Sequence, residues 1–207
     1  MALEFARRGA HVAVSGRRID RLHDTVSAIQ ALGSRGLALP CDVTDDEALQ
    51  AAVDRTLHTF GRLDVAVANA GYAAGGTVAD TSRARWSRQL EVNVVSTMRT
   101  AAIALPALLE TGGRIGLVGS VAAFTPMPGN APYVASKAAL LIAGRTLSAE
   151  LHGTGVSATV LQPGFVESEI GSVDNDGVHH PDRPDGRPQR LMWKADDAAR
   201  VMVNALD

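Results

Sequence analysis

The sequence predicts an α/β fold in which a doubly wound, parallel sheet carries helices on both faces. Short apolar segments rich in β-branched residues alternate with longer segments of helical period along the whole chain. This alternation indicates strands joined by right-handed helical crossovers and argues against a helix bundle or an all-β domain. The length of 207 residues and the hydrophobic content of 46% suit one domain spanning residues 1–207.

Short apolar runs mark the expected strands, and each is separated from the next by enough chain for a helix. A crossover of that length allows neighbouring strands to run parallel. The strands are expected at residues 11–15, 36–39, 63–68, 114–119 and 156–161.

Helical periodicity and end signals define the first two crossover helices. Ile19, Leu22 and Ile29 lie on one face of the first, and Gly33 follows as its expected C-cap. The second opens with a capping box over residues 44–47, in which Thr44 is the expected N-cap. It ends at Gly61.

Three further helical segments follow. One covers roughly residues 83–110. The next begins near Pro132, since a proline in the first helical turn lacks only an N–H that has no partner there, and it runs to about His152. A last helical pattern covers residues 194–206.

Residues 171–190 differ in composition from the rest of the chain. Asp, Gly, His and Pro recur throughout this stretch, and neither a helical nor a strand period survives. A loop of this length in a compact domain is usually disordered or covers a site. We therefore expect a mobile substrate loop here.

Charge and cysteine content exclude several classes of partner. With 20 Lys and Arg against 22 Asp and Glu, the net charge is −2, so we expect no nucleic-acid partner and no binding to an anionic membrane. The uncharged run 115–136 contains three prolines and is not a transmembrane helix. Cys41 is the only cysteine and is expected to be a buried small residue. Without a recognisable signal peptide, the expected location is cytoplasmic.

Tyr133 and Lys137 form the most informative pair of polar residues. They are four residues apart at the start of a predicted helix, so both side chains share one face. A phenol with a pKa of about 10 is a poor proton donor and acceptor at neutral pH, but a neighbouring ammonium lowers that pKa. The pair therefore predicts a general acid/base.

Ser120 and Asn93 complete a candidate catalytic set. Ser120 follows a predicted strand, at the edge of the sheet where open α/β folds bind ligands, and its hydroxyl can hydrogen-bond a carbonyl oxygen. Asn93 lies inside a predicted helix, where a polar amide has little reason to be unless it holds water or a backbone group.

With these residues in place, the sequence resembles the short-chain dehydrogenase/reductase family over nearly its whole length. The family's Asn, Ser and Tyr-x-x-x-Lys tetrad matches Asn93, Ser120, Tyr133 and Lys137 at the family spacing. Further segments match its motifs, with Ala68 in place of an Asn and Ser168 in place of a Thr. These segments are Ala68-Asn69-Ala70-Gly71, Cys41-Asp42-Val43, Pro163-Gly164 and Ser168.

The resemblance implies an oxidoreductase that transfers hydride between a nicotinamide cofactor and a small carbonyl or alcohol substrate. By it, Tyr133 is the general acid/base, Lys137 lowers its pKa and holds the nicotinamide ribose, Ser120 orients the substrate, and Asn93 anchors a proton-relay water. The resemblance also implies a cofactor-binding set, which Tyr133 and Lys137 join. Its other members are Arg17, Asp42, Val43, Asn69, Gly71, Pro163, Gly164 and Ser168.

The end of the first predicted strand bears on the choice of cofactor. An NAD site there uses an acidic residue on the ribose 2′-hydroxyl, whereas an Arg accommodates the 2′-phosphate of NADP. The chain has Arg17 and Arg18 at this point and no carboxylate, which favours NADP. The alternative is that both arginines only begin a solvated helix and that Asp20 matters more. The cofactor would then be NAD.

The family's Gly-rich pyrophosphate loop and the strand before it have no counterpart in the sequence. Thr111-Gly112 begins a string of similar letters, but it precedes a predicted strand and is expected to be a turn. In the family order the absent strand is central, so its two neighbours would lack a partner. We therefore expect a truncated form of a longer enzyme, and the alternative function is a non-catalytic Rossmann-like subunit.

Two further expectations concern metals and assembly. His179 and His180 are adjacent, and no third or fourth ligand is spaced to join them, so no metal site is expected. The helix from Pro132 carries small and apolar residues on more than one face, and family members commonly bury the second face between subunits. A homodimer or homotetramer is the implied assembly.

Overall fold

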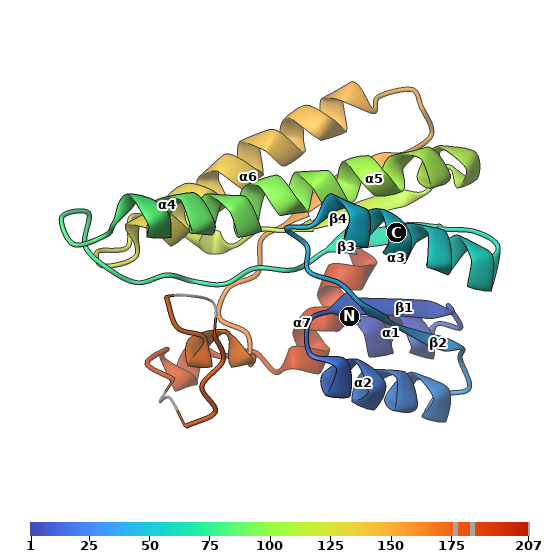
Figure 1. Cartoon of the computed structure of the whole chain (residues 1–207), viewed down its shortest axis with the longest axis horizontal. Coiled ribbons are helices and arrows are strands. Elements are labelled where there is room, and N and C mark those ends of the chain that lie inside the picture. Colours follow the sequence, from blue (N-terminus) through green and yellow to red (C-terminus); the bar gives the residue numbers. More distant parts are fainter. Residues whose placement is uncertain (176–177, 183–184, 207) are drawn as a thin grey trace.

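A computed structural model describes residues 1–175, 178–182 and 185–206 and confirms the α/β fold (Figure 1). Every predicted strand is present, with ends that differ from the prediction by at most two residues. All three strand pairs are parallel, as the helical crossovers predict. The strands are β1 (Val12–Gly16), β2 (Gly36–Pro40), β3 (Val65–Ala68), β4 (Arg114–Val118) and β5 (Ser157–Leu161).

The strands form two sheets. β1 pairs with β2, β4 lies between β3 and β5, and within the described residues no hydrogen bond joins β1 to β3. A hollow of about 280 Å³ opens beside the amino end of β3, where Phe5 and Leu206 are among its lining residues. The split agrees with the expectation that the two neighbours of the family's first strand each lack a partner along one edge.

Helices cover both faces of these strands (Figure 1). The bounds are α1 (Ala2–Arg7), α2 (Ile19–Ala31), α3 (Asp46–Phe60), α4 (Arg83–Leu90), α5 (Ser96–Thr111), α6 (Ala131–Glu150) and α7 (Ala195–Asn204). α5 packs on β3 and β4, and α6 packs on β5, whereas α2 packs on β1 and β2. α3 contacts both β2 and α5, so it connects the two groups of strands.

The ends of two crossover helices differ slightly from the prediction. Asp45, not Thr44, is the N-cap of α3, and its carboxylate accepts hydrogen bonds from Glu47 N at 2.9 Å and Ala48 N at 3.1 Å. The Thr44 hydroxyl instead donates to Asp42 Oδ1. α2 has Leu32 as its C-cap, and Gly33 follows it at a φ of 83°.

The helix predicted over residues 83–110 contains a π-helical turn, η1 (Glu91–Val95), between α4 and α5. The Ser96 hydroxyl donates to Glu91 O across this turn, at 2.9 Å. By length and composition alone, the run Arg83–Thr111 meets the criterion for a membrane span, with a mean hydropathy of 1.4. Its packing on β3 and β4 and its buried Gln89 and Asn93 are features of a core helix.

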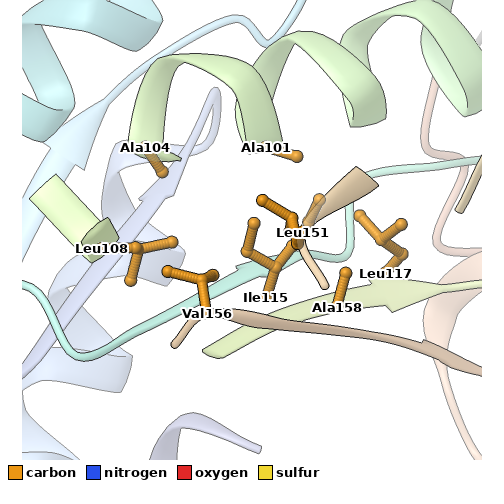
Figure 2. Packing of buried hydrophobic residues seen from close by; sticks show 9 residues of the cluster. Ala101, Ala104, Leu108, Ile115, Leu117, Leu151, Val156 and Ala158 are labelled. Carbon is orange, nitrogen blue, oxygen red and sulfur yellow. The ribbon is translucent and has the colours of Figure 1, made fainter. Parts of the chain in front are cut away.

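The main hydrophobic core lies among α5, α6 and the three-stranded sheet (Figure 2). Leu108, Ile115 and Leu117 at its centre are 1% exposed or less. Full burial of such a side chain contributes about 1.5–3 kcal/mol to folding. The complete cluster is Ala68, Ala101, Ala104, Leu108, Ile115, Leu117, Leu151, Val156 and Ala158.

The predicted loop 171–190 is irregular, with short 3₁₀ turns, η3 (Glu169–Ser172) and η4 (Gln189–Leu191), at its ends. Residues 176–177 and 183–184 of the predicted loop lie outside the described residues. Mutual hydrogen bonds between the Phe165–Glu167 backbone and Trp193 close the base of the longer 165–193 loop. Its mobility stays a prediction.

Candidate active site

The carboxyl ends of three parallel strands meet at one edge and present the candidate residues. Asn69 follows β3, Ser120 follows β4 and Pro163 follows β5. Val121 N donates to Pro163 O at 3.0 Å, which ties the last two strand ends together. This edge is where an open α/β sheet binds ligands.

Ser120 is held beside Tyr133. Its backbone N donates to Gln162 Oε1 at 2.6 Å, and its Oγ accepts a hydrogen bond from Ala122 N at 3.1 Å. The Ser120 side chain also hydrogen-bonds the Tyr133 hydroxyl. A buried serine whose oxygen already accepts a backbone N–H can direct its one O–H proton toward the site.

The electrostatics of Tyr133 differ from the prediction. Burial raises the pKa of Tyr133 above 10, and the hydrogen bond with Ser120 and the charge of Arg187 oppose this rise only in part. Lys137 was expected to lower the pKa of this phenol. Instead, its Nζ donates to Val118 O at 2.8 Å and lies 5.9 Å from the centre of the Tyr133 ring. The expectation is wrong for this geometry because desolvation of the phenolate outweighs the opposing contributions.

Lys137 is itself perturbed. The residue is only 5% exposed, and burial lowers the pKa of its ammonium from 10.5 to about 8. The group is therefore close to its titration point under mildly alkaline conditions. A lysine that carries its charge only below about pH 8 is an uncommon structural residue, and such perturbed groups concentrate at functional sites.

Asn93 joins the π-helical turn to the loop after β3. Its Oδ1 accepts from Tyr72 N at 3.1 Å, and its Nδ2 donates to Tyr72 O and Ser136 Oγ, both at 3.0 Å. The backbone O of Asn93 accepts from the Thr97 hydroxyl. The carboxamide therefore fixes the loop and the start of α6 relative to each other.

Gln89 is a second buried amide that sequence reasoning missed. It is fully buried, its Oε1 accepts from Ala74 N at 2.7 Å, and its Nε2 donates to Tyr72 O at 2.9 Å. Gln89 precedes Asn93 by four residues in the predicted helix. A second amide on the face that carries a candidate catalytic Asn was the available signal.

Gly71 packs closely against Asn93 and Lys137. A Cβ added to it would lie 3.1 Å from Asn93 Oδ1 and 3.7 Å from Lys137 Nζ. A side chain at this position would therefore crowd the Asn93 carboxamide. Glycine allows the backbone of the loop after β3 to approach Asn93 and Lys137 this closely.

The ends of β1 and β2 form a separate group. Cys41 N donates to Gly16 O, which brings Arg17 and Asp42 together, with 4.0 Å between Arg17 Nη1 and Asp42 Oδ2. A backbone hydrogen bond from Thr44 lowers the pKa of the Asp42 carboxyl. Val43, the next member of the predicted set, is partly buried.

Gly164 immediately precedes the 165–193 loop, and Ser168 lies within this loop. Arg187 donates to Val166 O at 2.9 Å, to Ser168 O at 2.7 Å and to Ser168 Oγ at 3.2 Å, and it also binds Asp185. Arg187 therefore holds the segment around Ser168. The sequence gives no periodic signal inside an irregular loop, so this role was not predictable.

Metal ligands do not converge in residues 1–175, 178–182 and 185–206, where no group of three or more His, Cys, Asp or Glu side chains is placed to hold an ion. His180 instead pairs with Asp174 at 2.6 Å, and His179 lies 4.0 Å from Glu169. Cys41 is buried, and burial raises the pKa of its thiol.

Known proteins resemble this chain over most of its length. A short chain dehydrogenase of Pseudocercospora fijiensis is 36% identical over 183 residues, which are 86% of this chain and 59% of that protein. An uncharacterized NAD-dependent oxidoreductase of Mycobacterium tuberculosis is 34% identical over 184 residues, covering 82% of this chain and 67% of that protein. This chain therefore spans less than two thirds of the fungal relative.

A solved structure of an alcohol dehydrogenase has a similar fold. The alcohol dehydrogenase of Thermococcus sibiricus, in complex with 5-hydroxy-NADP, superposes with a TM-score of 0.85 at 27% identity, covering 98% of this chain and 83% of that one. The family model for short chain dehydrogenases matches residues 1–178, which contain the tetrad and the ends of all five strands. The chain belongs to the short chain dehydrogenase family of oxidoreductases.

Proposed function

We propose that this chain carries out NADP-dependent hydride transfer between nicotinamide and a small carbonyl or alcohol substrate, with Tyr133 as the general acid/base. The observation that carries the proposal is the placement of Ser120 after β4 and of Tyr133 at the start of α6, with Lys137 Nζ 5.9 Å from the centre of the Tyr133 ring. These groups come from the end of β4 and the start of α6, so two rigid elements fix their geometry.

The roles of the protein residues follow from their protonation. In the reducing direction, Tyr133 donates its O–H proton to the carbonyl oxygen, and in the oxidising direction it takes the proton of the alcohol. Because burial keeps the phenol protonated at neutral pH, the structure suits the donor role. The Ser120 hydroxyl orients the same oxygen. The nicotinamide, when bound, supplies or accepts the hydride.

We assign the two ends of the dinucleotide to two groups of residues. Gly71, Lys137 and Ser168 would hold the nicotinamide half, and Arg17 and Asp42, after β1 and β2, would hold the adenosine half. Asn69, Pro163 and Gly164 follow β3 and β5 in the three-stranded sheet, and Val43 follows β2 in the two-stranded sheet.

The choice of NADP depends on charge. Arg17 and Arg18 end β1 and begin α2, and a guanidinium binds a phosphate in a bidentate manner. The relatives differ on this point. The mycobacterial relative is named NAD-dependent, whereas the archaeal structure contains an NADP derivative. NAD as the cofactor of the same chemistry is therefore the alternative.

A non-catalytic subunit is the second candidate function, and one observation favours it. β1–β2 and β3–β4–β5 share no strand pairing in the described structure, so the two halves of the cofactor site belong to different sheets. A chain whose halves are poorly fixed would not bind a dinucleotide across them.

One titration separates these functions. We expect NADPH to bind the 207-residue chain at micromolar concentration, with a change in nicotinamide fluorescence and a rise in the unfolding temperature, and NADH to bind more weakly. Turnover is then measured as NADPH oxidation with a panel of aldehydes and ketones. Equal or stronger binding of NADH selects the NAD alternative. A lack of binding by both cofactors selects the non-catalytic subunit.

We also propose that the chain forms a homodimer or homotetramer through α5 and α6. Large apolar side chains are exposed on these helices, with Leu109 at 47% and Ile142 at 60%. Contact between copies would remove this apolar surface from water. Sedimentation velocity should show a dimer or tetramer, and Ile142→Glu should shift it toward the monomer. A monomer at all concentrations contradicts the proposal.

A further inference from the structure

We propose that Glu169 determines the cofactor preference by competing with the 2′-phosphate of NADP for Arg18. Glu169 lies at the start of η3 in the 165–193 loop, and Arg18 is the residue immediately before α2. The proposal deepens the proposed function and depends on it, because it concerns the phosphate site assigned above to Arg17 and Arg18.

The contact joins segments that are 151 residues apart in the sequence. Arg18 Nη2 lies 2.5 Å from Glu169 Oε2, and Arg21 Nη2 lies 3.2 Å from Glu169 Oε1. The two oxygens of one carboxylate are thus divided between two arginines of the same helix start. The hydrogen bond from Arg18, together with the charges of Arg18 and Arg21, lowers the pKa of Glu169, so the carboxylate is ionised at neutral pH.

The ion pair between Arg18 and Glu169 places a negative charge beside the end of β1, where residues 17 and 18 are both arginines. The first strand ends in Arg17 and Arg18 without a carboxylate, which is the pattern that favours NADP. In the folded chain, Asp42 approaches Arg17 to 4.0 Å and Glu169 binds Arg18, so both guanidiniums face an acidic partner. The local charge is therefore closer to that of an NAD site than the sequence indicates.

A 2′-phosphate carries the same kind of charge and uses the same donors as the Glu169 carboxylate. Both ligands accept hydrogen bonds from a guanidinium fork, and two anions on the same guanidinium repel each other. NADP must therefore displace Glu169 from Arg18, whereas NAD, which has a neutral 2′-hydroxyl, need not. The cost of breaking the pair falls on NADP alone and reduces its advantage over NAD.

Displacement of Glu169 would also act on the loop. Glu169 follows Ser168, which the cofactor-binding set includes, and Arg18 and Arg21 are the α2 residues that hold this end of the loop. Linkage requires that a ligand which weakens this contact also loosens the loop by the same free energy. NADP binding is thereby coupled to the position of the 165–193 loop, and NAD binding is not.

The test measures NADPH and NADH dissociation constants for the wild type, Glu169→Gln and Glu167→Gln. Glu167 is the matched control, because it is an exposed carboxylate two residues away in the same loop, and no ion pair is found for it among the described residues. Both substitutions remove one negative charge. Glu169→Gln should tighten NADPH binding about three- to tenfold and leave NADH unchanged, and Glu167→Gln should change neither.

A double variant isolates the contact. In a chain that already carries Arg18→Ala, Glu169→Gln should no longer affect NADPH binding, because the shared guanidinium is gone. Equal effects of the two Glu→Gln changes would show only a long-range charge effect and would overturn the inference. An unchanged NADPH-to-NADH ratio in Glu169→Gln would overturn it as well, while the proposed function stands. If no variant binds either cofactor, both proposals fail.

Discussion

The three-stranded half of the molecule is more deeply buried and has more strand pairing than the two-stranded half. β4 has a strand on each side and a central core of Leu108, Ile115 and Leu117, each 1% exposed or less. No residue of β1 is fully buried, and β1 has one strand partner in the described structure. The tetrad belongs to the first half and Arg17 to the second. The proposed catalytic residues are thus positioned by a packed core, while the proposed adenosine end depends on a less constrained pair of strands.

The largest expected effect is on turnover and is confined to the three-stranded half. Tyr133→Phe should lower kcat by about 10²–10⁴-fold, because it removes the only proton that the phenol can donate, while NADPH affinity changes little. The measurement pairs NADPH oxidation with a fluorescence titration. Retained turnover contradicts the acid/base role, and a loss of cofactor binding would show that the two halves are not separable.

Core truncation compares the two halves directly. Leu117→Ala on β4 should cost about 3–5 kcal/mol in the free energy of unfolding, because rigid elements surround the cavity and prevent its collapse. Leu39→Ala on β2 should cost about 2 kcal/mol, since a strand with one neighbour can relax into the space. Urea unfolding followed by circular dichroism measures both. Equal losses would mean that the halves are equally packed.

The titration of Lys137 gives a pH-dependent effect within the three-stranded half. The folded-state pKa of about 8 is below the unfolded value of 10.5, so the unfolded state binds more protons between these limits and stability rises with pH. Relative to Lys137→Met, the wild type should gain on the order of 2–3 kcal/mol between pH 7.5 and pH 10.5. A pH-independent difference between the two proteins would place the folded pKa near 10.5.

The smallest effect concerns α3, which connects the halves. Asp45→Ala should cost about 1 kcal/mol, because it removes the acceptor for two N–H groups at the start of α3. Thr44→Ala should cost only a few tenths of a kcal/mol, since Thr44 bonds Asp42 and not the helix end. Thermal unfolding of both variants, compared at one pH, decides which residue is the cap. A larger loss for Thr44→Ala would favour the capping box that the sequence suggests.

Local sequence signals predicted most of the fold. Strands and helices follow periodicity and glycine positions such as Gly61, whose φ of 82° ends α3 as expected. The prediction assumed one α-helical period across residues 83–110, so it missed the π-helical turn, which adds one residue to the turn around Asn93. The N-cap shifted by one residue because Thr44 and Asp45 are both good caps and only tertiary contacts decide between them.

The proximity of Ser120, Tyr133 and Lys137 was predictable, but the electrostatics of these residues were not. The spacing of Tyr133 and Lys137 placed both on one helix face, and the structure brings them together with Ser120. The direction of the pKa shift of Tyr133 depends on burial, which no local pattern encodes. Glu169 and Arg187 were missed because their partners lie far away in the sequence or inside an irregular loop.

The π-helical turn gives this segment one residue more than a regular helix needs. A π-turn takes up one additional residue within a single turn, so removing one residue from Glu91–Val95 would restore a regular helix and leave α4 and α5 facing as they do now. Ala101, Ala104 and Leu108 would then stay in the core, while the geometry around Asn93 and its bonds to Tyr72 would change. A one-residue deletion would therefore disturb the candidate site and spare the hydrophobic core.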